Sequence, residues 1–508
     1  MFSVNNLKIE TKKGRVLIEN LSFVLNSGDK LAMIGEEGNG KSTLMKALIS
    51  PKLVEEYASV SGTISTCGAK IGYLEQKLDD FWNDFEIVDY FVHNQLSKEL
   101  EFDNYDLVYK FCSNLNSLGF DGNLIDNGTK IQNLSGGEKV KLQLAKLMTI
   151  EYDLYFLDEP TNDLDIETLE ILEKFIKQQA SPVVFISHDE TLLENVANRI
   201  LHIEQLIKKS KPKFTLEKCS YSEYVSARNR AIEHQTQVAY SERREQKKKE
   251  EILKQIKEKV RQDIKECRRD PSTGRILVKK MRNIKAQETR LENKELTEIP
   301  DVEEAIKIIA NQNISLPSQK KIVDATLDSL RAGEKVLAKN VSLAIYGAKK
   351  VAIVGKNGCG KTTLLRELLP ILKHTPGLKV GYFSQNYNEI LDFNDTPINV
   401  LINANKTLNP QTLLGCLKFT KEEMEHKIKD LSEGQKAKLS LLKIIIENNN
   451  VLVLDEPTRN LSPLSNPTIR ELLNSYHGSV ISVSHDRKFI AEVCDQTYEL
   501  CEKGLVRV

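Results

Sequence analysis

Short apolar runs, each three or four residues long, recur in both halves of the chain and alternate with longer polar stretches rich in helix formers. Runs this short, bounded by polar segments, are typical of buried parallel strands whose connections are helices. Their arrangement predicts an α/β fold with a parallel sheet in each half. The runs occupy residues 31–34, 155–157 and 183–186 in the first half, and 351–354, 451–454 and 480–483 in the second.

Between the halves, a long polar segment has a different periodicity. From about 221 to 268 it contains neither proline nor glycine and is rich in Glu, Lys, Gln and Arg, which favour a helix. About 45 helical residues at ~1.5 Å each predict an arm of roughly 65–70 Å. Four β-branched residues at every fourth position predict a narrow apolar stripe along it: Ile252, Ile256, Val260 and Ile264.

A second helix is expected after a turn at 270–274, which reads Asp-Pro-Ser-Thr-Gly. It runs from about 277 to 296 and has Met281, Ile284 and Leu291 on one face. The two helices together predict an antiparallel hairpin. We therefore divide the chain into a first domain at 1–207, a hairpin linker at 208–320 with its tip near 268–282, and a second domain at 321–508.

An internal repeat relates the two halves. Ser135 to Glu159 and Ser432 to Glu456 each span 24 residues, and a histidine follows each glutamate after 29 more. From the loop lysine to the serine the separations are 94 and 71 residues, and we assign the 94 − 71 = 23 extra residues of the first copy to its helical region. The repeated motifs lie at 35–42, 134–138, 157–161 and 187–189, and at 355–362, 431–435, 454–458 and 484–486.

Each glycine-rich loop has the pattern G-x-x-x-x-G-K-[ST] and follows an apolar run. In this context the glycines let the backbone wrap phosphate groups, and the loop amides point at them from the start of the next helix. The lysines are candidates to neutralise the β- and γ-phosphates, and Ser42 and Thr362 to bind Mg²⁺. A plain glycine-rich turn, the alternative, is disfavoured because the pattern occurs twice in the same context. The candidate ATP-binding residues are Gly35, Gly38, Asn39, Gly40, Lys41, Ser42, Thr43, Gly355, Asn357, Gly358, Gly360, Lys361, Thr362 and Thr363.

An Asp-Glu pair follows another apolar run in each copy and therefore lies at a strand end. An aspartate there suits Mg²⁺, and the glutamate beside it is placed to orient or deprotonate the attacking water. A histidine after the next run is a candidate to contact the γ-phosphate side of the site. The alternative for the acidic pair is a helix cap followed by a solvated acid. The candidates are Asp158, Glu159 and His188, and Asp455, Glu456 and His485.

Taken together, these motifs resemble the ATP-binding cassette family. Residues 134–138 and 431–435 look like its signature motif. In that family each signature serine binds the γ-phosphate held by the other cassette, so the resemblance implies one site from Lys41 with Ser432 and another from Lys361 with Ser135. It implies two ABC-type P-loop domains joined by the hairpin, and a cofactor set of ATP and Mg²⁺. It adds Ser135, Gly136, Gly137, Ser432 and Gly434 as ATP-binding residues, and Gln76 and Gln385 as Q-loop residues for catalysis and Mg²⁺.

Several positions depart from the family pattern. Neither 11–14 nor 330–333 contains the aromatic residue that stacks on adenine, so weak discrimination between ATP and GTP is expected. Glu36 and Glu37 put negative charge into the first phosphate loop. After the acidic pair the second copy continues Arg-Asn-Leu-Ser, where the first has Asn-Asp-Leu-Asp. We therefore expect two unequal sites.

Charge is distributed unevenly along the 508 residues. Lys plus Arg equals Asp plus Glu at 72 each, but residues 243–290 hold 18 basic and 8 acidic residues. Positive charge at the end of a projecting arm suits an RNA phosphate backbone; a solvated coiled coil without a ligand is the alternative. The candidate contacts near the turn are Arg268, Arg269, Arg275, Ile276, Leu277, Val278, Lys279, Lys280 and Arg282.

No uninterrupted apolar stretch of about 18 residues is present, and the first residues do not have the pattern of a secretory signal. The eight scattered cysteines are then expected to be reduced thiols in a cytoplasmic protein. We expect a monomer without a stable protein partner, in which the two cassettes close on each other.

Tandem cassettes, no membrane domain and a charged helical linker resemble the ABC-F proteins, whose members bind the ribosome near the tRNA exit site. The stretch 456–465 is similar to that of the Vga and Lsa type, which confers antibiotic resistance by target protection. That resemblance implies a linker that reaches toward the peptidyl-transferase centre, contacts rRNA and P-site tRNA, and relieves inhibition by lincosamides, pleuromutilins and streptogramin A drugs. A housekeeping translation factor of the same family and the ATPase subunit of a transporter are the alternatives.

Overall fold

The computed structural model describes residues 2–205, 211–266, 271–293, 297, 316–333 and 335–508. Two compact units are distinguished by their contacts. One consists of Met1–Tyr221 with Glu303–Val508, and the other is Ser222–Val302. The first unit contains both copies of the repeat, and the second contains the hairpin.

A six-stranded sheet forms the centre of the first copy, in the order β5-β6-β7-β3-β8-β9. All neighbouring strands are parallel except β8 and β9. The predicted strands are confirmed, and β3, β6 and β7 are buried at every position because helices cover both faces. The strands are β3 (Lys30–Ile34), β5 (Ile71–Leu74), β6 (Leu154–Asp158), β7 (Val183–Ile186), β8 (Arg199–Gln205) and β9 (Lys211–Glu217).

An antiparallel sheet in the order β2-β1-β4 packs its apolar side chains into the same core. Its strands are β1 (Phe2–Thr11), β2 (Val16–Leu25) and β4 (Ala58–Ser65). The helices of this copy are α1 (Lys41–Ile49), α2 (Ile87–Val92), α3 (Val108–Ser117), α4 (Gly122–Asp126), α5 (Gly136–Thr149), α6 (Ile166–Gln178) and α7 (Glu190–Val196).

The second copy repeats this topology with the strand order β13-β14-β15-β12-β16-β17. Its strands are β10 (Lys321–Ala332), β11 (Lys335–Tyr346), β12 (Lys350–Val354), β13 (Val380–Phe383), β14 (Val451–Asp455), β15 (Ser479–Val483), β16 (Gln496–Cys501) and β17 (Gly504–Arg507). Its helices are α11 (Lys361–His374), α12 (Pro397–Ala404), α13 (Pro410–Cys416), α14 (Lys421–Glu425), α15 (Glu433–Ile446), α16 (Asn466–Asn474) and α17 (Arg487–Val493).

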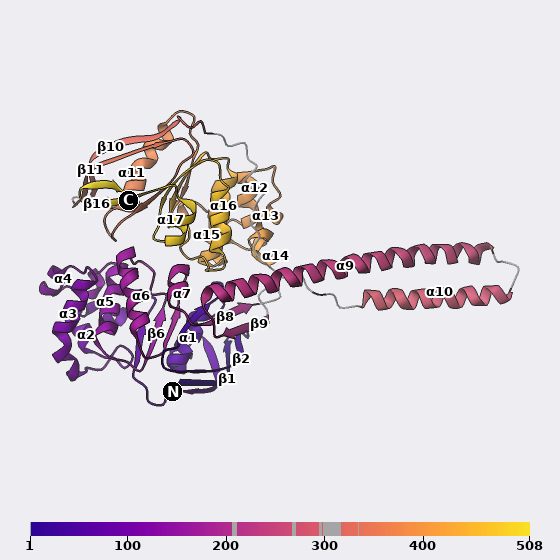
Figure 1. Ribbon diagram of the computed structural model, residues 1–508, viewed down its shortest axis with the longest axis horizontal. Coiled ribbons are helices and arrows are strands. Elements are labelled where there is room, and N and C mark those ends of the chain that lie inside the picture. Colours follow the sequence, from indigo (N-terminus) through magenta and orange to yellow (C-terminus); the bar gives the residue numbers. More distant parts are fainter. Residues whose placement is uncertain (1, 206–210, 267–270, 294–296, 298–315, 334) are drawn as a thin grey trace. The chain divides into compact units, whose positions relative to one another are not determined.

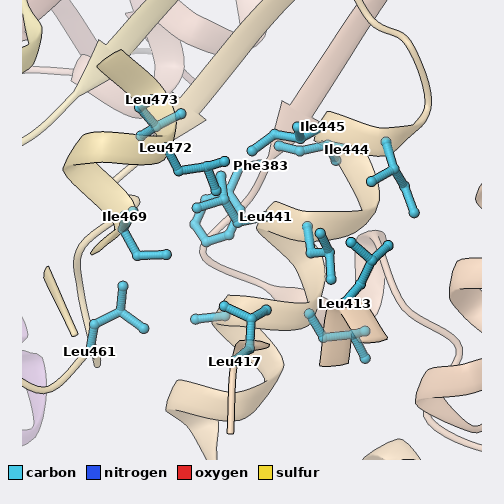
Figure 2. Close-up of a cluster of buried hydrophobic side chains, with 14 of the residues drawn as sticks. Phe383, Leu413, Leu417, Leu441, Ile444, Ile445, Leu461, Ile469, Leu472 and Leu473 are labelled. Atoms are coloured by element: carbon cyan, nitrogen blue, oxygen red, sulfur yellow. The ribbon is translucent and has the colours of Figure 1, made fainter. Parts of the chain in front are cut away.

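A large apolar cluster fixes the helices of the second copy to its sheet. Figure 2 shows Phe383 from the end of β13 in one cluster with side chains of α13, α15 and α16, among them Leu413, Leu441 and Leu472. Because α15 begins at the signature motif, this packing sets the direction of the helix that carries Ser432 at its N-terminus.

The 23 extra residues of the first copy do not all lie in its helical region, so this expectation was wrong. Lys41 to Gln76 spans 35 residues and Lys361 to Gln385 spans 24, a difference of 11 that precedes the helices. The first copy makes β4 in this interval, whereas the chain of the second passes from α11 to β13. The remaining 12 residues follow Gln76.

The predicted antiparallel hairpin is present as α9 (Tyr221–Glu266), which has 46 residues, and α10 (Pro271–Glu292), which has 22. The two helices run side by side (Figure 1). They are joined by an ion pair between Lys257 and Glu288 at 2.6 Å and by a small apolar cluster. Its members are Leu253, Val260 and Ile284, with Ile264, Leu277, Met281 and Leu291 partly buried against them.

Two details of the hairpin differ from expectation. Residues 271–274, predicted as a turn, are the first turn of α10, because proline is well tolerated at the first helical position. The predicted stripe is only half right: Val260 is 1% exposed, but Ile252 and Ile256 are 55% and 38% exposed. Residues spaced by four are offset by about 40° around the helix axis at each step, so the four predicted positions do not stay on one face. Toward the start of the stripe, Leu253 is the buried residue instead of Ile252.

Candidate active site

Each glycine-rich loop connects the central strand of a sheet to a helix. Gly40 and Gly360 precede α1 and α11 with φ of 91° and 98°, a left-handed conformation that favours glycine. A Cβ at Gly360 would also lie 2.7 Å from Leu337. Backbone carbonyls of each loop hold the lysine that follows. Lys41 Nζ donates to Gly35 O at 2.8 Å, and Lys361 Nζ donates to Gly355 O at 2.8 Å. The two loops therefore have the same geometry.

The strand-end aspartates contact the residues predicted to bind Mg²⁺. Ser42 Oγ donates to Asp158 Oδ1 at 3.1 Å, and the Thr362 hydroxyl hydrogen-bonds Asp455. Asp158 Oδ2 is buried and has no hydrogen-bond partner among the described residues, and burial raises the pKa of this carboxyl to about 6. A buried, unpartnered carboxylate oxygen beside a hydroxyl fits a divalent cation.

No group of three His, Cys, Asp or Glu side chains that could hold a metal occurs within the described part of the chain. In each copy one hydroxyl and one carboxylate lie together, which fits Mg²⁺ whose remaining positions are taken by phosphate and water, the usual arrangement for this ion.

Glu159 accepts hydrogen bonds from three side chains. His188 Nε2 lies 3.2 Å from Oε1, and Oε2 accepts from Gln76 Nε2 at 2.9 Å and from Asn162 Nδ2 at 2.6 Å. Burial alone raises the pKa of this carboxyl, but His188, Lys41 and Asn162 outweigh it and hold the pKa of Glu159 at about 2. The first site thus has an ionised glutamate in a fixed orientation.

Glu456 has a different environment. It accepts a hydrogen bond from the backbone N–H of His485 at 3.3 Å, and His485 Nε2 lies 3.7 Å from Oε1. Burial raises the pKa of Glu456 to about 8 and lowers the pKa of His485 to about 4, so both groups are mainly neutral near pH 7 despite their ion-pair distance. Gln385 does not donate to Glu456 as Gln76 donates to Glu159, because Gln385 Nε2 donates to Asp455 Oδ1 at 3.2 Å instead.

The difference between the two glutamates has a sequence cause. Arg459 stands where the first copy has Asn162, and its guanidinium pairs with Asp163 across the interface at 2.8 Å. Glu456 therefore lacks the amide donor that Asn162 provides. Both glutamates adopt positive φ, 50° for Glu159 and 53° for Glu456, a conformation that costs free energy and is concentrated at functional sites.

The two signature helices each face the phosphate loop of the other copy. Ser135 and Ser432 cap α5 and α15, each through a capping box. On one side, Glu37 accepts a hydrogen bond from Gly434 N in the first turn of α15. On the other, a Cβ at Gly137 in the first turn of α5 would lie 3.1 Å from Asn357 Nδ2. The loop of Lys41 therefore meets the helix of Ser432, and the loop of Lys361 meets the helix of Ser135.

A cavity of ≈ 520 Å³ lies at the second loop and is lined by both copies. Asp163, Leu164 and His188 of the first copy line it, together with the loop from Asn357 to Thr363. From β10 and β11 the lining includes Ala332, Lys335 and Leu337, and none of the lining residues is Phe, Tyr or Trp. A base bound in this cavity would therefore have no Phe, Tyr or Trp of the lining to stack on.

Several residues at the interface between the two copies were not predicted from the sequence. A buried ion-pair network joins the copies beside the histidines: Arg470 bonds Glu190 at 2.6 Å, and Arg487 bonds Glu173 and, at 3.3 Å, Asp189. Arg470 and Glu190 each have side chains only 5% exposed. A signal was present, because Glu173 and Arg470 are each 14 residues after the strand-end glutamate of their copy and carry opposite charges.

The predicted hairpin contacts are only partly described. Arg268 and Arg269 lie outside the described residues. Ile276 and Val278 are 68% and 59% exposed, whereas Leu277 packs inside the hairpin. The remaining basic residues of the group are exposed: Arg275, Lys279, Lys280 and Arg282.

Two P-loop domains of the same topology, each with strand-end carboxylates and a serine-capped helix facing the other's loop, define a tandem P-loop ATPase. The model of the family described as ABC transporter matches residues 18–162 and 338–459, more than half of the chain. The chain belongs to the ATP-binding cassette family, and within it to the ABC-F ATPases.

Curated relatives match nearly the whole chain. ATP-binding protein Uup of Buchnera aphidicola subsp. Schizaphis graminum is 30% identical, over 96% of this chain and 79% of the relative. ABC transporter F family member 5 of Arabidopsis thaliana is 27% identical, over 96% and 73%.

Solved structures support the fold. An archaeal ribosome recycling factor, aABCE1, aligns with a TM-score of 0.60 at 16% identity, over 100% of this chain and 90% of that one. The structure titled RNase-L Inhibitor aligns with a TM-score of 0.59 at 15% identity, over 99% and 90%. Among the described residues, no helix has the length and apolar character needed to cross a membrane.

Proposed function

We propose that this ATPase is an ATP-gated ribosome-binding factor of the ABC-F type that protects the ribosome from antibiotics. The observation that carries the proposal is the hairpin, a long pair of helices that is exposed and basic around Arg275 and Lys280. A row of cations on a helical arm suits a phosphate backbone, and rRNA and P-site tRNA are the RNAs that it would meet. The ABC-F relatives support the same reading.

In the proposed cycle, ATP held by one phosphate loop is bound from the other side by the signature helix of the opposite copy. Ser42 with Asp158 and Thr362 with Asp455 would hold Mg²⁺, which neutralises phosphate charge when bound. Glu159 orients and accepts a proton from the attacking water, and His188 fixes the orientation of that carboxylate. Loss of the terminal phosphate then removes the bridge between the copies and allows release.

Ribosome co-sedimentation of the variant Glu159→Gln/Glu456→Gln tests this function. Both substitutions remove the proton acceptor but keep the shape of the side chain, so ATP should hold the copies closed. We expect the variant to sediment with ribosomes in ATP and to stay in the supernatant in ADP. Equal distribution in the two nucleotides would exclude the ATP gate, and recovery only from membranes would favour a transporter subunit.

Charge reversal at the hairpin end tests the RNA contact. We expect Arg275→Glu/Lys279→Glu/Lys280→Glu to weaken ribosome binding by roughly tenfold or more near 0.1 M salt, and to make the binding less dependent on salt, because fewer counterions are released. The matched control reverses three exposed lysines on α9, Lys247, Lys248 and Lys249, which leaves the net charge the same. Equal losses in the two triple variants would show that general charge, not the hairpin end, matters.

Drug susceptibility separates protection from a housekeeping role. The susceptibility of a bacterial host to a lincosamide, a pleuromutilin and a streptogramin A drug is measured with and without the protein. A protective protein lowers the susceptibility, whereas a housekeeping factor leaves the susceptibility to all three drugs unchanged. We expect Ile276→Ala/Val278→Ala to reduce protection while ribosome binding is kept, because these side chains project into solvent. Ile252→Ala, which is 55% exposed elsewhere on the hairpin, is the matched control.

A further inference from the structure

The two phosphate loops differ in the residue that faces the opposite copy. Glu37 occupies the position that Asn357 occupies in the second loop. Its Oε2 accepts the N–H of Gly434, the second residue of the 14-residue helix α15. The first N–H groups of a helix have no partner within the helix and lie at its positive end, so they bind anions well. At the first site a side-chain carboxylate already takes one of them.

The surroundings of Glu37 identify this position as part of the nucleotide site. Its charge interacts with Lys41, His188 and Glu159, and its carboxylate is so close to α15 that a Cβ at Gly434 would lie 3.0 Å from Oε2. Burial raises the pKa of Glu37, which reflects how little water reaches it. The preceding Glu36 also contacts the second copy, through an ion pair with Lys418 at 3.2 Å.

Among the described residues, the second phosphate loop itself supplies no equivalent anion. The carboxylate beside the first turn of α5 comes from the same copy as that helix: Asp163 Oδ2 would lie 3.1 Å from a Cβ at Gly136. Asn357 uses its amide as a donor, to the backbone O of Asp163, and its own N–H lies 3.5 Å from Asp165 Oδ2. The neighbouring Lys356 pairs with Glu167 at 3.0 Å, and both of these side chains are well exposed. No carboxylate of the second loop reaches the first turn of α5 among the described contacts.

We propose that Glu37 is an internal competitor for the terminal phosphate of ATP at the first site. Its carboxylate takes the α15 N–H group that the phosphate would take, so ATP must displace it before the copies close around the nucleotide. ADP lacks that phosphate and does not need to displace it. This inference rests on the proposed function, in which the signature helix of one copy binds the phosphate held by the other.

Two consequences distinguish this role from a structural one. The first site binds ATP more weakly than the second but binds ADP equally well, so Glu37 lowers the preference of the first site for ATP. Without nucleotide, the Glu37–Gly434 hydrogen bond helps to hold the copies together. When ATP binds, a contact between its terminal phosphate and α15 replaces this hydrogen bond. The two sites then fill in a fixed order, the second before the first.

Site-resolved nucleotide binding tests the proposal. In full-length protein with Lys361→Ala, which silences the second site, Glu37→Asn should tighten binding of a fluorescent non-hydrolysable ATP analogue by tenfold or more and leave ADP binding unchanged. Asparagine is the residue of the second loop, so the fold accommodates it. In protein with Lys41→Ala, the reciprocal Asn357→Glu should weaken ATP analogue binding and not ADP binding. An unchanged or lower ratio of ADP to ATP-analogue dissociation constants in Glu37→Asn overturns the proposal.

Two further variants make the result specific. Lys418→Gln breaks the neighbouring Glu36 contact without touching α15, and it should leave the ADP to ATP-analogue ratio unchanged; a change as large as that of Glu37→Asn would show that any loss of contact between the copies acts in the same way and overturns the proposal. Ser432→Glu adds a carboxylate at the start of α15 and should weaken ATP analogue binding at the first site. If it has no effect, the shared site itself is wrong, a failure that is distinct from a failure of Glu37 alone.

Discussion

The ATPase activity that remains after Glu159→Gln is expected to rise about tenfold per pH unit between pH 6 and pH 7 and to level off above pH 8. The substitution reduces turnover at the first site by about 10²–10⁴-fold, so the second site dominates. Burial raises the pKa of Glu456 to about 8, so below that pH the carboxyl is neutral and accepts no proton. The ionised fraction, and with it the rate, grows about tenfold per pH unit while the pH is at least one unit below the pKa, and more slowly as the pKa is approached.

The converse variant, Glu456→Gln, should show a flat profile from pH 6 to pH 9. Its working glutamate is Glu159, whose pKa of about 2 keeps it ionised throughout this range. Steady-state phosphate release at saturating ATP measures both profiles. Adding Asn162→Ala to this variant is the control, because two donors to Glu159 remain and the profile should stay flat. Superimposable profiles for the two single variants would contradict the asymmetry.

The positions of the loop lysines and strand-end acids were predictable because they follow local rules. A strand, a glycine-rich loop and a helix N-terminus are consecutive in the chain, so Lys41 and Ser42 must lie together. The environment of Glu159 was not predictable in this way. Its donor Gln76 is 83 residues away in the sequence, and whether that amide turns to the glutamate or, as in the second copy, to the aspartate depends on packing.

The parts of the fold that were missed have a similar explanation. The central strands are buried at every position and were found as uniform apolar runs. β4 was not found, because half of its positions are exposed and only Ala58 is fully buried. In the hairpin, the sequence showed that α9 has an apolar stripe. Its apolar residues are so sparse that either of two neighbouring faces of the helix could pack against α10. The contacts with α10 select the face that carries Leu253 and Val260.

The ion pairs between the two copies could have been predicted from the aligned positions of the repeat. In a two-fold arrangement, residue i of one partner contacts residue j of the other, and j contacts i. Glu173 and Arg470 are equivalent positions in the repeat, as are Glu190 and Arg487. The pairs Arg470–Glu190 and Arg487–Glu173 have this relation. Opposite charges at aligned positions of a repeat therefore indicate that the copies face each other, and that two first copies would repel.

This network supplies the second prediction: Arg470→Met should lower the free energy of unfolding by about 3 kcal/mol. Breaking a buried ion pair typically costs about 3–5 kcal/mol, because the remaining charge stays buried. Among the described residues, Glu190 would keep Lys488, at 3.4 Å, as its one cationic partner. Glu190→Met should cost less, since Arg470 retains Glu492 at 2.6 Å, a carboxylate that is 49% exposed.

The double variant Arg470→Met/Glu190→Met decides between pairing and simple packing. With both charges removed and the volume filled by apolar groups, we expect it to be more stable than the sum of the single losses predicts, by about 1–3 kcal/mol of coupling. Urea unfolding of all four proteins in the same buffer gives the coupling energy. Additive losses would show that the two side chains act independently. In that case the matched charges of the repeat would not be what selects the first copy as the partner of the second.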